Sequence, residues 1–122
     1  YVPEEVLCSD SLRTRKTFSG IAPALPGAPV LELKPALYHA GPDVMMAVLR
    51  HAKANTVMMI GHNPGIAEFA ARLVAHPPHS SDFPRYPTGA TLVVDFDVKD
   101  WSDVTFGSGV TVDFIVPREI VA

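Results

Sequence analysis

The stretch TVMMIGHNPGIAEFAARL, Thr56 to Leu73, predicts the fold class because its apolar residues form a strand-like run in the first part and recur at helical spacing in the second. Val57 to Ile60 are uniformly apolar and follow a β-branched residue, which is typical of a central strand covered on both faces, as in a parallel sheet. Pro64 suits the first turn of a helix, where its missing N–H costs little. The apolar residues that follow recur at helical spacing: Ile66, Phe69, Ala70, Leu73 and Val74. A buried strand therefore turns directly into a helix, and His62 stands at the turn.

The same strand-to-helix order is predicted twice before this stretch. Val6 to Ser9 is typical of a short buried strand, and Ser9-Asp10-Ser11 offers N-cap side chains for a helix. The apolar residues of that helix are Leu12, Phe18, Ile21, Ala22 and Leu25. Val30 to Leu33 is a second strand, and Gly41-Pro42-Asp43 begins a second helix. The apolar residues of this second helix are Met45, Val48, Leu49 and Ala52.

The C-terminal third predicts a pair of strands. Ala75 to Thr88 has the composition of a loop, and Thr91 to Asp97 and Val110 to Val116 follow as strands suited to antiparallel pairing. The second of these places alternate residues on one face: Val110, Val112, Phe114 and Val116. The whole order predicts an α/β fold, a three-layer α/β/α sandwich with a mainly parallel sheet and a C-terminal antiparallel strand pair, in a single domain over residues 1–122.

Composition excludes several classes of function. The chain has 122 residues, 48% of them hydrophobic and 19% charged, which fits one globular domain. Its net charge of −3 gives no basic surface for nucleic acid or for a membrane, and no apolar run is long enough to cross a bilayer. Cys8 is the single cysteine, so no disulfide can form within the chain, and we expect a reducing, cytoplasmic setting.

Two strand-to-helix junctions carry the candidate chemistry. Ligands of open α/β sheets bind beyond the carboxyl ends of the strands, where helix N-termini favour anions. The first junction adds Arg13, and the second adds His62. A cation at a helix N-terminus opposes the helix dipole, and a bound phosphoryl group would explain Arg13 there because its planar fork donates to two oxygens. Ser9 and Asn63, at the same two turns, complete the predicted phosphate-binding set.

Simpler interpretations stay open for these residues. Arg13 could belong to a solvated helix face, as we expect for Arg15 and Lys16, and His62 could be a capping or loop histidine. Asn63 is most simply an N-cap before a proline.

The other histidines suggest less chemistry. His39, after Tyr38, could line a cleft, although a surface position is favoured. We expect the others at a helix end or in a loop: His51, His76 and His79. No set of His, Cys, Asp and Glu has the spacing of metal ligands, so neither a metal nor a cofactor is expected.

Four segments resemble a known family. SDSLRTRKT resembles the S-x-x-L-R-x-R-Q-T segment of the histidine phosphatase superfamily, the phosphoglycerate-mutase-like proteins. VMMIGHNPGIAEFAARL resembles the V-G-H-N-P-G turn of its SixA-type phosphohistidine phosphatase branch. ALYHAGPDVMMAVLR, which lies between these two segments, resembles the L-Y-x-A segment of that branch, and PTGATLVVDFD resembles its C-terminal strand pair. The resemblance thus covers nearly the whole chain.

The resemblance implies a phosphatase that acts on a phosphorylated protein or a small phosphoester. Arg13 matches the family's phosphate-binding arginine, and His62 matches its second, non-nucleophilic histidine. The family's nucleophilic histidine lies in an Arg-His-Gly motif that this sequence lacks, so we expect a first strand, that turn and a first helix upstream of Tyr1. Lys16 replaces the family's glutamine.

Other functions stay open at this point. Many members of the family carry an acidic proton donor, for which Glu32 and Asp43 are poor candidates here. The chain could be a non-catalytic phosphate-binding module or an inactive fragment. It could also be an α/β domain in which His62 only caps a helix. The sequence does not predict an oligomeric state.

Overall fold

The computed structural model describes residues 2–24, 27, 29–87 and 89–116. Its strands and helices alternate in the predicted order: β1 Glu5–Cys8, α1 Leu12–Ile21, β2 Val30–Leu33, α2 Pro42–Leu49, β3 Val57–Ile60, α3 Gly65–Leu73, β4 Thr91–Asp95 and β5 Val110–Ile115. Three short 3-10 turns that were not predicted complete the chain: Ala22–Ala24, Pro35–Leu37 and Trp101–Asp103. No helix among the described residues is long and apolar enough to cross a membrane.

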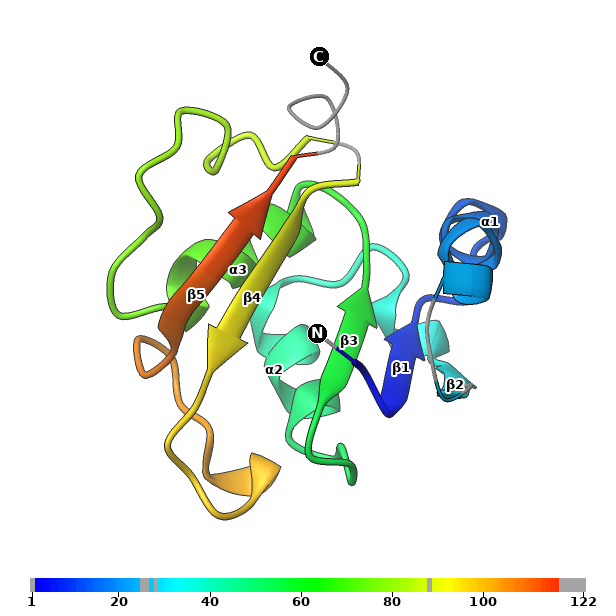
Figure 1. Ribbon diagram of the computed structural model, residues 1–122, viewed down its shortest axis with the longest axis horizontal. Helices are drawn as coiled ribbons and strands as arrows, with labels where there is room; N and C mark the ends of the chain where they lie inside the picture. Colours follow the sequence, from blue (N-terminus) through cyan, green and yellow to red (C-terminus); the bar gives the residue numbers. More distant parts are fainter. Residues whose placement is uncertain (1, 25–26, 28, 88, 117–122) are drawn as a thin grey trace.

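The strands form two small sheets. β1 lies in the middle of a parallel sheet of order β2-β1-β3, and β4 and β5 form a separate antiparallel pair beside it (Figure 1). The predicted α/β class, with a parallel sheet and a C-terminal antiparallel pair, is confirmed. Among the described residues β3 does not take the predicted central place, because it pairs there with β1 alone and its four residues are half-buried. A uniformly apolar run indicates that a strand is buried, but it does not show whether the strand lies at the centre or at the edge of its sheet.

Both faces of β1 are covered. All four of its residues are buried, and successive side chains of a strand point to opposite faces. Leu7 packs into the main core with Met45 and Phe69 of α2 and α3. Val6 and Cys8, on the opposite face, are fully buried as well. Coverage on both faces fits the predicted sandwich.

Helix α1 buries little of its apolar surface. Leu12 is 66% exposed, Phe18 and Ile21 are only partly covered, and the buried residue of this helix is Thr14. The helix stands apart from α2 and α3, beside the carboxyl end of β1 (Figure 1). Leu25, predicted in the same helix, lies outside the described residues.

A bulge interrupts the alternation predicted for β5. Val93 pairs with Asp113 but Val94 pairs with Thr111, which leaves Val112 as the extra residue. Val112 is 44% exposed, whereas Phe114 packs in a second core against Phe83. The alternating apolar pattern therefore does not form one buried face.

Candidate active site

The two predicted junctions meet in the structure. β1 and β3 are parallel neighbours, so their carboxyl ends reach the same edge of the sheet. His62 Nε2 lies 2.9 Å from the hydroxyl oxygen of Ser9 and 3.2 Å from that of Ser11. Ser9 is fully buried, and the exposed Arg13 follows in the first turn of α1. Groups that are about 50 residues apart in the sequence thus form one polar cluster, which we call the junction cluster: Ser9, Ser11, Arg13 and His62.

A network of hydroxyl groups holds the first junction. Ser11 is the N-cap of α1, and its side chain accepts a hydrogen bond from the backbone N–H of Thr14. The Thr14 hydroxyl donates to the carbonyl oxygen of Ser9 at 2.7 Å, which ties the helix to the end of β1. Sequence reasoning predicted a cap in this region but did not identify the contact of Ser11 with His62. The spacing Ser11-x-x-Thr14 is the signal that could have shown the network.

Burial sets the charge of His62. Desolvation lowers the pKa of His62 below its ordinary 6.5, and the nearby positive charges of His39 and Arg13 lower it further. The neutral imidazole is therefore favoured at neutral pH while the cluster holds no anion. An anion bound between His62 and Arg13 would reverse this effect by favouring the imidazolium.

The second junction is built differently from the prediction. Helix α3 begins at Gly65, Pro64 occupies its N-cap position, and no side chain caps it. The Asn63 amide instead donates to the carbonyl oxygens of Tyr86 at 2.9 Å and Arg85 at 3.4 Å. The interpretation of Asn63 as an N-cap is thus wrong, because the loop before β4 offers its side chain other acceptors.

A cavity of about 350 Å³ lies beside the junction cluster. Its lining residues come from the loop before α2 and from the start of α3: His39, Ala40, Gly41, His62, Asn63, Pro64, Gly65 and Glu68. The His39 ring stands 6.1 Å from the His62 ring, measured between centroids. His39 is exposed, as the favoured interpretation predicted, but it also lines this cavity.

Gly65 allows the two sides of this cavity to approach. A side chain at Gly65 would collide with the carbonyl oxygen of Ala40. Ala40 is buried and follows His39 directly. The second glycine of the GHNPG turn is therefore required by the close backbone contact that brings His39 towards His62.

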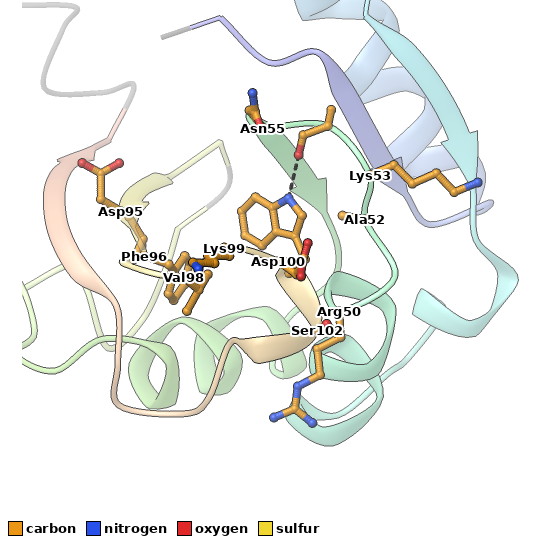
Figure 2. Close-up of a pocket in the computed structure, with 13 residues that line it drawn as sticks. Arg50, Ala52, Lys53, Asn55, Asp95, Phe96, Val98, Lys99, Asp100 and Ser102 are labelled. Carbon is orange, nitrogen blue, oxygen red and sulfur yellow. Dashed lines mark hydrogen bonds between the residues drawn. The ribbon is translucent and has the colours of Figure 1, made fainter.

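A larger cavity of about 460 Å³ lies elsewhere, between the segment before β3 and the end of β4 (Figure 2). The Trp101 indole N–H donates to the carbonyl oxygen of Ala54 across it, at 2.6 Å. Lys53 extends away from the cavity in Figure 2, and Arg50 donates through Nε to the carbonyl oxygen of Val104. None of the predicted site residues lines this cavity.

The described residues contain no group of three or more His, Cys, Asp or Glu side chains placed to hold a metal ion. The positive charges at the junction cluster come from Arg13 and, when it is protonated, from His62. The cluster can therefore offer hydrogen-bond donors and positive charge to an oxyanion.

Comparison with known proteins identifies the fold. No protein-family model and no curated protein matches the chain. Among solved structures, one assigned as the phosphohistidine phosphatase SixA of Nakamurella multipartitia superposes with a TM-score of 0.78 at 21% identity. That match covers 95% of this chain and 72% of the other.

Two further structures show the same likeness. A protein histidine phosphatase SixA complexed with tungstate gives a TM-score of 0.69 at 24% identity, over 98% of this chain and 72% of the other. A structure assigned as SixA of Agrobacterium tumefaciens gives 0.70 at 22% identity, over 96% and 70%. The protein is thus of the α/β class with a phosphoglycerate-mutase-like fold. Its particular fold is that of the SixA phosphohistidine phosphatases, which the motifs predicted.

Proposed function

We propose that this protein is a phosphatase of the histidine phosphatase superfamily, which hydrolyses a phosphohistidine or a small phosphomonoester. One observation carries the proposal: His62 Nε2 contacts the hydroxyl groups of Ser9 and Ser11 at the N-terminus of α1, one turn from Arg13. A helix N-terminus in contact with an imidazole, with the positive charge of Arg13 nearby, forms a site suited to a phosphoryl group. The SixA-type fold supports the same activity.

In this mechanism Arg13 and His62 stabilise the charge on the oxygens of the transferring phosphoryl group. Both are donors placed where negative charge develops. The phosphoryl group would pass to a nucleophilic histidine, and water would then hydrolyse the phosphohistidine intermediate. The pKa of His62 is lowered in the anion-free protein, so binding of a phosphate dianion would be accompanied by uptake of a proton.

The nucleophile belongs to the Arg-His-Gly segment that the family resemblance places upstream of Tyr1. One feature of the described chain supports a further strand there: β3 has one described partner, β1, although its four residues are apolar.

The test uses the protein with its natural upstream coding sequence and assays a phosphoramidate and an aryl phosphate. We expect His62→Ala and Arg13→Ala each to lower kcat by about 10²- to 10³-fold. Arg15→Ala and His51→Ala are matched controls, because both residues are exposed and line neither cavity. Full activity in both His62→Ala and Arg13→Ala would contradict the assignment.

A binding module without turnover is the second candidate, favoured by the absence of an Arg-His-Gly motif from the 122 residues. The coding sequence upstream of Tyr1 separates the two candidates, since the motif there indicates an enzyme. Phosphate titration followed by the ring signals of His62 tests both against a purely structural role. Unmoved signals at saturating phosphate would leave His62 only a structural role.

A further inference from the structure

We infer that His39 is the proton donor to the leaving group in the proposed phosphatase reaction. The inference rests on the proposed function and deepens it, because it assigns the acid for which the sequence offered only Glu32 and Asp43. Neither carboxylate lines the cavity at His62, whereas His39 does. Glu32 pairs with Lys34 at 2.9 Å, and Asp43 faces Arg72 at 3.9 Å.

The rings around the cavity place His39 across from His62. The two imidazoles are nearly perpendicular, at 82°, with centroids 6.1 Å apart. Tyr38 stacks on His39 at 4.1 Å and meets the edge of His62 at 5.5 Å. Hydrogen bonds of about 2.9 Å from each imidazole can therefore reach different oxygens of one phosphoryl ester held between them.

The backbone holds His39 in an uncommon conformation. Its φ of 53° lies in the left-handed region, which few residues other than Gly adopt, although Asn, Asp and His do so more often than the rest. Leu37 and Ala40, both buried, anchor the loop on either side, and Gly65 lies against the Ala40 carbonyl. A non-glycine residue kept in such a conformation at a cavity is typical of functional sites.

The remaining acid of the cavity is Glu68, which lies in the first turn of α3, a position that suits negatively charged side chains. His62 Nε2 contacts the hydroxyl groups of the first junction, and the proposed function already assigns this imidazole to the phosphoryl oxygens. Among the described residues that line the cavity, His39 is thus the remaining group that can donate a proton, and its ring contacts Tyr38 and the edge of His62.

The step balances without a further reagent. As the nucleophilic imidazole forms its bond to phosphorus, the bond from phosphorus to the leaving oxygen or nitrogen breaks. The leaving atom keeps the electron pair and takes the proton from the His39 ring. In the second step, water forms a bond to phosphorus and gives a proton to neutral His39, while the bond from phosphorus to the nucleophilic imidazole breaks and that imidazole keeps the electron pair.

The experiment measures how kcat of the full-length protein depends on the leaving group of the substrate. The variants are His39→Asn and His39→Gly, since both residues accept a left-handed backbone. The substrates run from p-nitrophenyl phosphate, whose leaving group needs little protonation, to phenyl phosphate, whose leaving group needs more. We expect the loss in kcat to grow along this series, from within about tenfold to about 10²-fold or more. Added imidazole should restore phenyl phosphate turnover in His39→Gly.

The outcomes separate the inference from the proposed function. The same loss on every substrate, or no loss, would overturn the role of His39 while leaving the phosphatase assignment intact. His62→Ala should lower every rate by a similar factor. No turnover of any substrate by the wild-type protein would overturn both. His51→Asn is the control, because His51 is an exposed histidine whose Nδ1 pairs with the Ala47 carbonyl oxygen outside the cavity.

Discussion

The two junctions share the order of strand, turn and helix but are stabilised in different ways. At the first, the side chains of Ser11 and Thr14 cap and tie α1, which buries little of its own surface. At the second, no side chain caps α3, and the helix is held by its core residues Phe69, Ala70 and Leu73. One functional site is thus assembled from a helix held by hydrogen bonds and a helix held by packing.

The two helices meet different requirements of the site. Tight packing of α3 fixes His62 relative to the sheet and to the loop of His39. The weakly packed α1 supplies the polar groups: the hydroxyls of Ser9 and Ser11 and the guanidinium of Arg13. Substitutions in the two helices should therefore affect stability very unequally.

The largest effect is expected in the core of α3. Phe69→Ala should lower the free energy of unfolding by about 3–5 kcal/mol, because Phe69 is 4% exposed and lies in the main core. Leu12→Ala in α1 should change it by less than about 0.5 kcal/mol, because Leu12 is exposed. Urea unfolding measures both. Equal losses would show that α1 is packed as firmly as α3.

Glycine substitutions should distinguish the same two helices. Gly65→Ala should cost about 1–3 kcal/mol, since its new methyl group meets the Ala40 carbonyl oxygen. Gly20→Ala in α1 finds open space and should instead stabilise by up to about 1 kcal/mol. Thermal unfolding compares the pair, and a Gly65→Ala protein as stable as the wild type would refute the close contact.

Loss of the cap should matter only at the first junction. Ser11→Ala should lower stability by about 1 kcal/mol and reduce helix content, because it removes the acceptor for the Thr14 N–H. Ser19→Ala, an exposed site in the same helix, is the control. Circular dichroism during urea unfolding provides the measurement, and equal behaviour of the two variants would argue against the cap.

The smallest effect concerns pH. The pKa of His62 is lowered first by burial and then by the positive charges of His39 and Arg13, so the unfolded state binds the proton more tightly than the folded state. The contribution of His62 to stability is therefore present above the ordinary pKa of 6.5 and is lost as the pH falls below it. His62→Gln should flatten this part of the stability profile.

A nuclear magnetic resonance titration tests the cause of that shift. The pKa of His62 should rise in His39→Asn, because a positive neighbour is removed, and should rise in the wild type when phosphate binds. His51→Asn should leave it unchanged. A pKa of His62 that ignores both His39 and phosphate would contradict the proposed geometry.

Local sequence patterns predicted most of the strands and helices, but they did not predict which residues pack against each of them. The strands Val30–Leu33 and Val57–Ile60 have the predicted bounds, because apolar runs between turn residues are local signals. The exposure of Leu12 and Val112 did not follow from their apolar patterns, because burial depends on which elements pack against a face. Asn63 shows the same limit: its acceptors, the carbonyls of Arg85 and Tyr86, come from a distant loop.

The sequence by itself determined the order of strands and helices and the placing of Ser9, Arg13 and His62 at strand ends. Periodicity and turn residues act over a few positions, and parallel strands share one carboxyl edge. Only the tertiary structure decided that His62 contacts Ser9 and Ser11 and that His39 faces it across a cavity. Such contacts depend on distances between elements, which are set by the close approach of Gly65 to Ala40 and by the packing of α3.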